Sequence, residues 1–291
     1  MTETVVVTGA SGQLGRLVIS DLKQIAQAAN VIGVVRHAAT QQADLGVELR
    51  AGDYNDLASM KRAFSGADKV LMISSSEIGS RRVAQHRNVI DATAAAGVGL
   101  LIYTSILHAD TNPMTLAAWH RETEALIRAS GVPFVLLRNG WYSENYTTNA
   151  AIAATRGTLL GAAGKGRISS AARSDFALAA ATVLATHSAQ DGRTYELAGD
   201  TSYTLAELAA EIGRQARKPV TYSNLGEADY KAALMSAGLA DDYAGLYAES
   251  DAKAALGSLF DDSRQLSKLI GRPTTTMAQS VAAELLARRS L

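Results

Sequence analysis

The sequence predicts an α/β fold, a doubly wound parallel sheet followed by a smaller, mostly helical C-terminal lobe. Three observations lead to this prediction. Short apolar, β-branched runs alternate with helical patterns over 1–139, a glycine-rich turn follows the first run, and the alternation ends after Asn139. Continuous apolar runs are typical of parallel strands that are buried on both faces. We therefore expect a first domain at 1–139 and a smaller lobe at 140–291, packed on it.

The expected strands of the first domain are short, apolar and rich in β-branched residues. They are Thr4–Thr8, Val31–Arg36, Val47–Ala51, Lys69–Ser74, Leu100–Thr104 and Pro133–Arg138. Helical patterns fill the intervals at Gln13–Ala28, Asn55–Phe64, Arg81–Ala96 and Leu116–Ser130. Asn55 and Asp56 are suitable N-terminal caps for the second helix. Right-handed crossovers between successive strands then give the doubly wound sheet.

The second half of the chain has a different pattern. It contains Ala-rich helices, a glycine-rich segment at Gly161–Gly166, and two short strand-like stretches at Thr194–Leu197 and Val220–Tyr222. These elements are too few for a second doubly wound domain. We expect this lobe to cover the strand ends of the first domain and to add the last strands of its sheet.

The charge balance and the cysteine count disfavour several classes of protein. The chain has 28 Lys and Arg against 28 Asp and Glu, no cysteine, and 47% hydrophobic residues. A chain without a basic field is not expected to bind nucleic acid. The absence of cysteine excludes disulfides, zinc–thiolate sites and thiol nucleophiles, and it fits a reducing compartment. We expect no metal site.

The chain also lacks the usual signals for export or membrane insertion. The N-terminus, MTETVVVTGASG, has no basic region followed by a long apolar region. The uncharged run Ala92–Ala109 is divided by Gly97 and Gly99, so a helix end followed by a buried strand explains it better than a membrane span. We expect a cytoplasmic protein, and the sequence leaves its oligomeric state open.

The strongest local motif is the turn after the first predicted strand. Its GxxGxxG spacing covers Gly9, Ala10, Ser11, Gly12, Gln13, Leu14 and Gly15. The first glycine permits the tight turn, the second lets the backbone approach a pyrophosphate, and the third lets helix and strand pack closely. The pyrophosphate would lie on the N-terminus of the following helix. Between a strand and a helix, the motif predicts a Rossmann-type dinucleotide site rather than an ordinary glycine-rich turn.

The end of the second strand indicates which dinucleotide binds. An NAD site expects a carboxylate about 20 residues past the glycines, but the sequence has Arg36 there. Because a guanidinium pairs well with a 2′-phosphate, we predict NADPH, and the alternative for Arg36 is a solvated strand end. Asp53, after the third strand, is placed to accept a hydrogen bond from the adenine amino group. The serines that close the fourth strand would line the cofactor's path: Ser74, Ser75 and Ser76.

The Tyr/Lys pair of ordinary short-chain dehydrogenases is missing, since none of the ten tyrosines is followed by Lys four residues later. On the helix after the fifth strand, His120 and Glu124 share one face at i, i+4. An imidazole oriented by a carboxylate can relay a proton, so His120 is a candidate catalytic residue. The alternative is an exposed ion pair with no catalytic role.

An aromatic and polar segment follows the sixth strand. It consists of Trp141, Tyr142, Ser143, Glu144, Asn145 and Tyr146. At the carboxyl end of an open sheet, such a segment can pack a nicotinamide and support a flat aromatic substrate. Tyr142 and Asn145 are further candidate catalytic residues, and Arg173 is expected to reach the cofactor. The alternatives are a Trp/Tyr core patch and an ion pair of Arg173 with Asp175 or another acid.

The lack of a strong acid indicates a substrate that takes hydride without being protonated first. Quinones fit, because hydride addition gives a stabilised hydroquinone anion. Catalysis would then depend mainly on holding the nicotinamide C4 close to the acceptor.

With these residues assigned, the chain resembles the NmrA-like atypical short-chain dehydrogenases over its full length, most closely their bacterial quinone reductases. The shared landmarks include TGASGQLG at Thr8–Gly15, QHRNVI at Gln85–Ile90, LLRNGWYSENY at Leu136–Tyr146 and LFDDSRQLSKLIGRPTTT at Leu259–Thr276. The resemblance implies an NADPH-preferring, flavin-free quinone reductase. It implies cofactor contacts at Gly9–Leu14, Arg36, the Ser76 region, Trp141–Tyr146 and Arg173. Relatives include triphenylmethane dye reductases and a dinucleotide-sensing regulator, NmrA, which supply the alternative functions.

Overall fold

The structure is a computed structural model that describes residues 2–27, 29–37 and 45–287. These residues form two compact units. The first unit takes its residues from 1–109, 119–139 and 174–196, and the second from 110–118, 140–173 and 197–291. The chain thus passes between the units several times, and one of these passages lies between residues 139 and 140.

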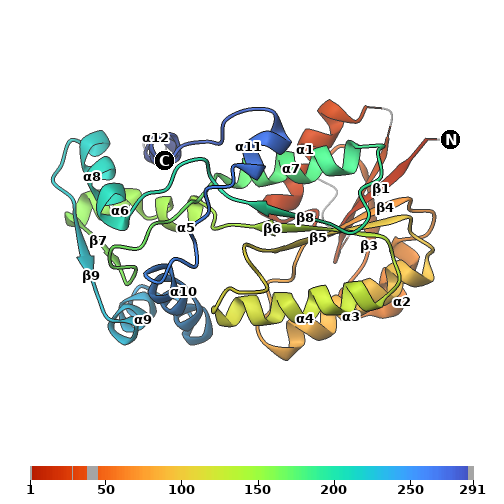
Figure 1. Ribbon diagram of the computed structural model, residues 1–291, viewed down its shortest axis with the longest axis horizontal. Coiled ribbons are helices and arrows are strands. Elements are labelled where there is room, and N and C mark those ends of the chain that lie inside the picture. Colours follow the sequence, from red (N-terminus) through yellow and green to blue (C-terminus); the bar gives the residue numbers. More distant parts are fainter. Residues whose placement is uncertain (1, 28, 38–44, 288–291) are drawn as a thin grey trace. The chain divides into compact units, whose positions relative to one another are not determined.

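A seven-stranded sheet forms the centre of the first unit (Figure 1). In sheet order its strands are β3 (Glu48–Ala51), β2 (Asn30–Val35), β1 (Thr4–Val7), β4 (Lys69–Met72), β5 (Leu100–Ile106), β6 (Phe134–Asn139) and β8 (Arg193–Leu197). The strands β1 to β6 pair in parallel, and Val6 of β1 lies between Ile32 and Val70. The doubly wound parallel sheet is confirmed. Because the strand order reverses at β1, a ligand crevice is expected at the carboxyl ends of β1 and β4.

Helices cover both faces of this sheet (Figure 1). On one face lie α1 (Gln13–Ile25) and α7 (Arg173–Ala185), and on the other lie α2 (Leu57–Ala63), α3 (Ser80–Ala95) and α4 (Thr115–Ala129). Asp56 caps α2 by accepting from the backbone N–H groups of Ala58 and Ser59 at 2.9 and 3.2 Å, so Asn55 lies outside the helix. Ala28, the expected end of the first helix, lies outside the described residues.

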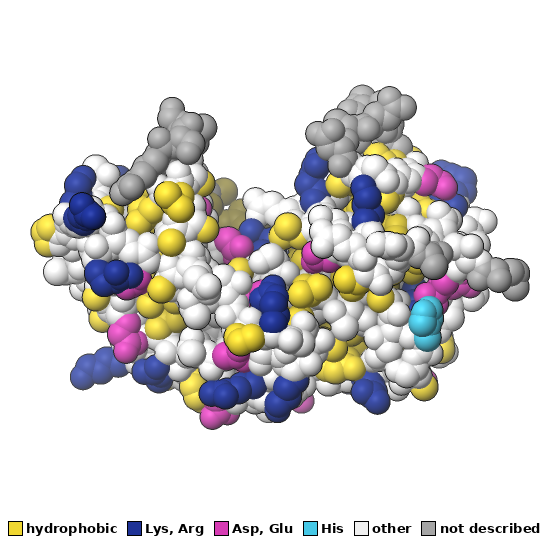
Figure 2. Space-filling view, turned by 90° about the horizontal axis from the view of Figure 1, so that it is seen from above, with side chains coloured by type: hydrophobic (Ala, Val, Ile, Leu, Met, Phe, Trp, Pro, Cys, Tyr) yellow, Lys and Arg dark blue, Asp and Glu magenta, His cyan; other side chains and the backbone are white. Residues whose placement is uncertain are grey.

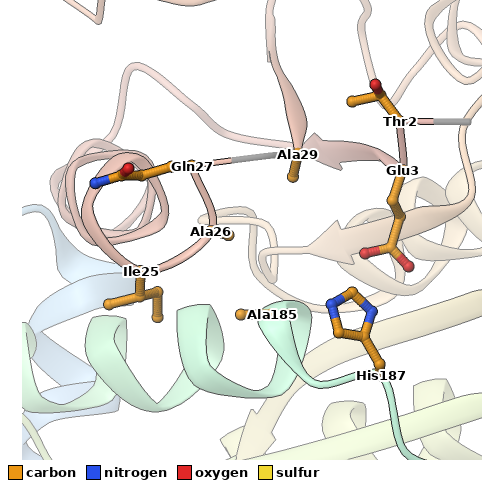
Figure 3. Close-up of a pocket in the computed structure, with 8 residues that line it drawn as sticks. All are labelled: Thr2, Glu3, Ile25, Ala26, Gln27, Ala29, Ala185 and His187. Carbon is orange, nitrogen blue, oxygen red and sulfur yellow. The ribbon is translucent and has the colours of Figure 1, made fainter.

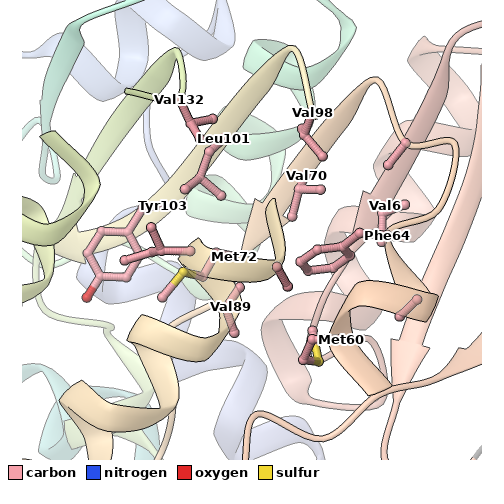
Figure 4. Packing of buried hydrophobic residues seen from close by; sticks show 14 of the residues in the cluster. Val6, Met60, Phe64, Val70, Met72, Val89, Val98, Leu101, Tyr103 and Val132 are labelled. Carbon is pink, nitrogen blue, oxygen red and sulfur yellow. The ribbon is translucent and has the colours of Figure 1, made fainter. Parts of the chain in front are cut away.

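The apolar core of the first unit lies between the sheet and α2, α3 and α4 (Figure 4). Val6, Val70 and Leu101 come from neighbouring strands, and Met60 and Phe64 of α2 pack against the sheet. All five side chains are fully buried. Burial of an apolar side chain of this size contributes roughly 1.5–3 kcal/mol. This packing fixes the positions of the strand ends where the site residues lie.

The second unit consists mainly of helices with one small sheet. Its helices are α5 (Glu144–Thr147), α6 (Ala150–Arg156), α8 (Leu205–Ala216), α9 (Glu227–Ser236), α10 (Asp241–Ala254), α11 (Gln265–Ile270) and α12 (Met277–Ala287). The strands β7 (Thr158–Gly161) and β9 (Thr221–Asn224) pair in parallel, with Leu159 opposite Tyr222.

Part of the expected strand arrangement in this half is wrong. The stretch at Thr194–Leu197 joins the main sheet within β8, but the stretch at Val220–Tyr222 overlaps β9, which begins at Thr221 and pairs with β7. The sequence did not predict β7. This strand has four residues and directly follows Gly157, whose φ of +70° ends α6, so it is too short to show a clear period.

The surface carries both signs of charge. On the face drawn in Figure 2, Lys and Arg side chains are interspersed with Asp and Glu, in keeping with 28 residues of each sign. Over the described ranges, no helix is long and apolar enough to cross a membrane, and the run Ala92–Ala109 is divided between the end of α3 and β5. The same ranges hold no group of three His, Asp or Glu side chains that could bind a metal ion.

Candidate functional site

The glycine-rich turn joins β1 to α1 at the carboxyl end of the sheet. Gly9 has a φ of +59°, a left-handed conformation that glycine adopts without strain. Its carbonyl accepts from the N–H of Gly12 at 2.9 Å, and the N–H of Ala10 donates to the carbonyl of Val34 in β2 at 3.1 Å. These bonds hold the turn in a tight conformation against the neighbouring strand.

Gly15 lets α1 pack directly on this turn. A Cβ atom at Gly15 would lie 2.4 Å from the carbonyl oxygen of Gly9 and 2.9 Å from the Cα of Ala10. The helix is capped by Gly12, which has no side chain to bond the N–H groups of the first helical turn. The N-terminus of α1 therefore offers open N–H donors and a positive dipole end to an anion.

Arg36 follows β2 and Asp53 follows β3, the two strands that lie on the side of β1 away from β4. Arg36 is exposed directly after β2, and within the described ranges its guanidinium has no hydrogen-bond or ion-pair partner. Asp53 is half-buried after β3, where its Oδ1 accepts from the backbone N–H and the side-chain amide of Asn55 at 2.8 and 3.0 Å. These two bonds do not use Oδ2 of Asp53. The turn, Arg36 and Asp53 therefore all lie at the carboxyl ends of neighbouring strands.

The segment after β4 is tied to its neighbouring strands by side chains. The Oγ1 of Thr8 at the end of β1 accepts from the N–H of Ile73 at 3.0 Å and lies 2.5 Å from the hydroxyl of Tyr54. The N–H of Ser74 donates to the Oγ1 of Thr104 in β5 at 2.9 Å. The predicted serines are thereby held beside the glycine turn.

Two buried residues of α3 fix the next part of this segment. The N–H of Ser75 donates to the Nε2 of His86 at 2.9 Å. The Nη1 of Arg82 donates to the carbonyl of Ser75 and, at 3.2 Å, to the carbonyl of Glu77. Ser76, between these anchored residues, is exposed. Arg82 and His86 therefore determine the backbone path at 75–77.

The geometry expected for His120 and Glu124 is wrong. Both side chains are buried, 3% and 4% exposed, and they do not bond each other. The Nδ1 of His120 lies 2.7 Å from the hydroxyl of Tyr103, and its Nε2 lies 3.0 Å from Nη2 of Arg82. The i, i+4 spacing suggested a pair, but side chains from β5 and α3 reach His120 instead.

The partners of His120 determine where its proton lies. Arginine has only donors, so Nε2 of His120 accepts, and Nδ1 carries the proton that it donates to Tyr103. Burial, followed by the positive charge of Arg82, holds the pKa of His120 well below its usual range. His86 has the same tautomer, since its Nε2 accepts from Ser75 and its Nδ1 lies 2.8 Å from the Oγ1 of Thr123. Both imidazoles are neutral, and both rings are fully engaged.

Glu124 belongs to a buried ion-pair network. Its carboxylate accepts from Nε and Nη2 of Arg138 at 3.0 and 2.8 Å and from the hydroxyl of Ser105 at 2.6 Å. The Nη1 of Arg138 also bonds Glu196 of β8 at 2.8 Å. The loss of one partner of such a buried pair typically costs about 3–5 kcal/mol. This network holds α4 to β5, β6 and β8, which is a structural role.

In the second unit, Tyr142, Glu144 and Arg173 lie together. The backbone N–H of Arg173 donates to both carboxylate oxygens of Glu144, at 2.9 and 3.1 Å. Its guanidinium lies over the ring of Tyr142, with Cζ 4.8 Å from the ring centroid, a cation–π contact. Glu144 thus holds the backbone of Arg173 while Tyr142 directs its side chain.

Other members of the same segment serve the packing of the second unit. Trp141 is 8% exposed and packs edge-on against Tyr247, with the ring centroids 6.0 Å apart. The hydroxyl of Tyr146 donates to Oδ1 of Asp251 at 2.7 Å, and the hydroxyls of Ser143 and Ser170 lie 2.9 Å apart. These contacts favour the core-patch alternative for the three buried residues, whereas Tyr142, Glu144 and Asn145 are half-buried.

A cavity of about 590 Å³ lies in the first unit, away from the strand ends just described (Figure 3). It is lined by Glu3 before β1, Ala29 before β2, and His187 after α7, and Figure 3 shows Glu3 and His187 turned into it. The carboxylate of Glu3 is already paired with Lys69 at 2.9 Å. Because doubly wound sheets bind ligands at the carboxyl ends of their strands, this cavity at the amino ends is not the cofactor site.

A second cavity, of about 300 Å³, lies within the second unit. Residues of α5, α6, β7 and α9 line it, and we call it the α5–α9 pocket. Asn145 is the candidate catalytic residue that lines this pocket, together with Ile152, Arg156, Leu160 and Tyr230. The pocket thus extends from the aromatic segment that the sequence singles out.

Comparison with known proteins establishes the family. A family model for NAD(P)H-binding proteins matches residues 9–187, from the glycine turn to the end of α7. The chain belongs to the NAD(P)H-binding family. Quinone oxidoreductase 2 of Escherichia coli K12 is 51% identical to this NAD(P)H-binding protein over 280 residues, which are 96% of this chain and 97% of that protein.

Solved structures agree with this assignment. The crystal structure of the NADPH-dependent quinone oxidoreductase of Escherichia coli complexed with NADPH has a TM-score of 0.92 at 51% identity, covering 97% of this chain and 99% of the other. The triphenylmethane reductase of Citrobacter sp. complexed with NADP(H) has a TM-score of 0.91 at 34% identity, covering 96% and 99%. The resemblance that the sequence motifs predicted is confirmed.

Sequence reasoning missed Arg82 and His86 as positioning residues. Their i, i+4 spacing on a predicted helix was available, but nothing local shows that this face is buried against the end of β4. It also missed Arg156 and Tyr230, since the lining of the α5–α9 pocket comes from distant segments.

Proposed function

We propose that this protein is an NADPH-dependent, flavin-free reductase that transfers a hydride to a quinone. The observation that carries the proposal is the open N-terminus of α1 beside β2, which is followed directly by Arg36, an exposed residue whose guanidinium has no partner within the described ranges. The identity to a protein named quinone oxidoreductase 2, over 96% of this chain, supports the quinone as acceptor.

For the first unit, we propose that the pyrophosphate binds the N–H groups at the start of α1. Gly9, Ala10, Ser11, Gly12, Gln13, Leu14 and Gly15 form this turn. Arg36 would pair with the 2′-phosphate, and the Oδ2 of Asp53 would accept from the adenine amino group. Ser74, Ser75 and Ser76 would border the ribose and nicotinamide. Their common position at the carboxyl ends of β1 to β4 supports these assignments.

For the second unit, we propose that Trp141–Tyr146 and Arg173 contribute to nicotinamide and acceptor binding. The half-buried members of this set, Tyr142, Glu144, Asn145 and Arg173, have the accessible surface that such contacts need. This proposal gives 1–139 the dinucleotide-binding role and 140–291 the substrate-binding role. We also propose that the protein works in the cytoplasm, which the absence of cysteine supports.

When bound, NADPH supplies a hydride from its nicotinamide C4, which reduces the quinone to a hydroquinone anion. The protein's contribution is orientation of the two reactants, an effect of about 7–11 kcal/mol at most. Because His120 and His86 are neutral and fully hydrogen-bonded, neither is suited to donate a proton. We assign His120 a positioning role through Arg82, with water as the source of the proton.

Steady-state oxidation of NADPH with benzoquinone and several naphthoquinones tests the activity. We expect turnover well above the uncatalysed rate. Absence of turnover with every quinone would refute the proposal.

Arg36→Ala tests the cofactor preference. We expect the KM for NADPH to rise about 30-fold, which corresponds to a charge-assisted hydrogen bond of about 2 kcal/mol. The KM for NADH should change less than about twofold, because NADH has no 2′-phosphate. Arg62→Ala, on the exposed side of α2, is the control. Equal losses for both cofactors would contradict the assignment.

A dye reductase is the second candidate, favoured by the 34% identity to the triphenylmethane reductase. Specificity constants for dyes and quinones separate the two activities. A dinucleotide sensor would bind NADPH with little turnover, so hydride transfer faster than cofactor release in a transient-state experiment would exclude it.

A further inference from the structure

The α5–α9 pocket has apolar walls that remain open to solvent. Leu159 and Ala153 are buried in its lining, while Ile152 and Leu160 are 42% and 36% exposed. A volume of about 300 Å³ is at the lower end of the range for small-molecule sites, roughly 300–1,000 Å³. The volume of the pocket therefore matches a small ring compound.

Several polar groups in this pocket have unused hydrogen-bonding capacity. Among the described residues, nothing bonds the side-chain amides of Asn145 and Asn149, the hydroxyl of Tyr230 or the guanidinium of Arg156. Burial, followed by the negative charge of Asp251, raises the pKa of Tyr230, so its hydroxyl stays protonated and can donate. A few convergent polar groups in an apolar pocket are typical of sites that bind small molecules.

The charges around the pocket differ in how far they are compensated. Lys231 of α9 is paired with Asp241 at 2.8 Å. Asp251, which influences Tyr230, is buried and accepts from Tyr146 at 2.7 Å and from the N–H of Ala162 at 3.0 Å. Arg156, at the end of α6, has no ion-pair partner in the described part of the chain. It is therefore a charged side chain of the lining that is free to pair with a ligand.

We propose that the α5–α9 pocket binds the electron acceptor and that Arg156 makes it selective for acceptors with an anionic substituent. The acceptor class is a flat one- or two-ring quinone that carries a carboxylate or sulfonate. Its ring lies against Ile152 and Leu160, its carbonyl oxygens accept from Asn145 and Tyr230, and its anionic group pairs with Arg156. The same charge disfavours cationic triphenylmethane dyes. This inference rests on the proposed function for the reduction of the bound quinone. The binding of the quinone to the pocket does not depend on that function.

Kinetics with acceptors of different charge test the selectivity. The acceptors are 1,4-naphthoquinone, which is neutral, 1,2-naphthoquinone-4-sulfonate, which is anionic, and malachite green, which is cationic. For Arg156→Gln, we expect kcat/KM for the sulfonate to fall about fivefold, the scale of an exposed ion pair, with less than a twofold change for the neutral quinone. For Arg156→Glu, the sulfonate should lose about 20-fold while the dye gains.

A pair of matched controls keeps the test specific. Arg217→Gln removes an exposed charge of the second unit that lies outside the pocket and has no ion-pair partner among the residues described, and it should leave the kinetics with all three acceptors unchanged. Ala233 lines the pocket and its neighbour Ala232 does not. Ala233→Trp should raise the KM of every quinone more than tenfold, and Ala232→Trp should not. Equal effects of Arg156→Gln on all acceptors, or no effect of Ala233→Trp, would overturn the inference.

Equilibrium binding separates this inference from the proposed function. Calorimetric titration of the sulfonate into the protein without NADPH should give a Kd that is about fivefold weaker in Arg156→Gln. If quinones bind in this way but are not reduced, the reductase proposal fails and the pocket assignment stands. If quinones are reduced but binding ignores both Arg156 and Ala233, the pocket assignment fails alone.

Discussion

The phosphate-binding turn of the first unit and the α5–α9 pocket of the second unit are built in different ways. The turn uses backbone N–H groups from a single stretch, Gly9–Gly15, and its geometry depends on where glycine stands. The pocket uses side chains spread from Asn145 to Ala237. Backbone sites of the first kind tolerate almost no added atom, whereas side-chain sites of the second kind can be adjusted one group at a time.

Gly15→Ala should have the largest effect, because a Cβ would lie 2.4 Å from the carbonyl oxygen of Gly9. We expect NADPH affinity to fall at least about 100-fold and the free energy of unfolding to fall by about 1–3 kcal/mol, as in other overpacked sites. Fluorescence titration and urea denaturation measure these quantities. Gly245→Ala in α10, where the nearest atom is a flexible lysine carbon at 3.6 Å, is the control; it should leave NADPH affinity unchanged and, as an alanine inside a helix, should not lower the free energy of unfolding. Wild-type affinity in Gly15→Ala would contradict the packing argument.

Arg82→Met should have the next largest effect and would show that side chains also support the cofactor edge. The change leaves Nε2 of His120 and the carbonyls of Ser75 and Glu77 without a donor, so we expect a loss of about 3 kcal/mol in the free energy of unfolding. Because Arg82 fixes the segment proposed to border the cofactor, the KM for NADPH should rise about tenfold, with kcat less affected. Arg81→Met, the exposed neighbour, should change neither quantity.

The buried histidines should make the first unit sensitive to acid. Burial, followed by the charge of Arg82, lowers the pKa of His86 to about 3, so between pH 6.5 and about 3 the unfolded chain binds a proton that the folded chain does not. The free energy of unfolding should therefore decrease as the pH is lowered through this window, by about 1.4 kcal/mol per pH unit for this group. His86→Gln should have a shallower slope between pH 7 and pH 5 in urea denaturation. An unchanged slope would show that His86 is protonated in the folded state.

Tyr230→Phe should have the smallest effect, since it removes one hydroxyl from the α5–α9 pocket. Loss of one neutral hydrogen bond, about 1 kcal/mol, should raise the KM of naphthoquinones about fivefold and leave the KM of NADPH unchanged. Tyr243→Phe in α10 is a control outside the pocket lining. A larger effect on NADPH than on the quinone would place Tyr230 at the cofactor instead.

Prediction from the sequence succeeded where local rules decide the outcome. Apolar runs predicted β1 to β6, and the glycine spacing predicted a tight turn that the φ of Gly9 and the close approach at Gly15 explain. It failed for His120 and Glu124, because a shared helical face does not show which strands pack against it. It also failed for β7, whose four residues gain their partner from a strand about 60 residues away.

The parallel sheet, the phosphate-binding turn and the family of this protein can all be predicted from the amino-acid order, because backbone conformation and hydrophobic period are local properties of the chain. The packing of the folded chain brings Arg82 and Tyr103 to His120 and Arg138 to Glu124. It also brings Asn145, Arg156 and Tyr230 into the lining of one pocket. Those outcomes depend on burial and on contacts between segments far apart in the chain. No local pattern contains that information.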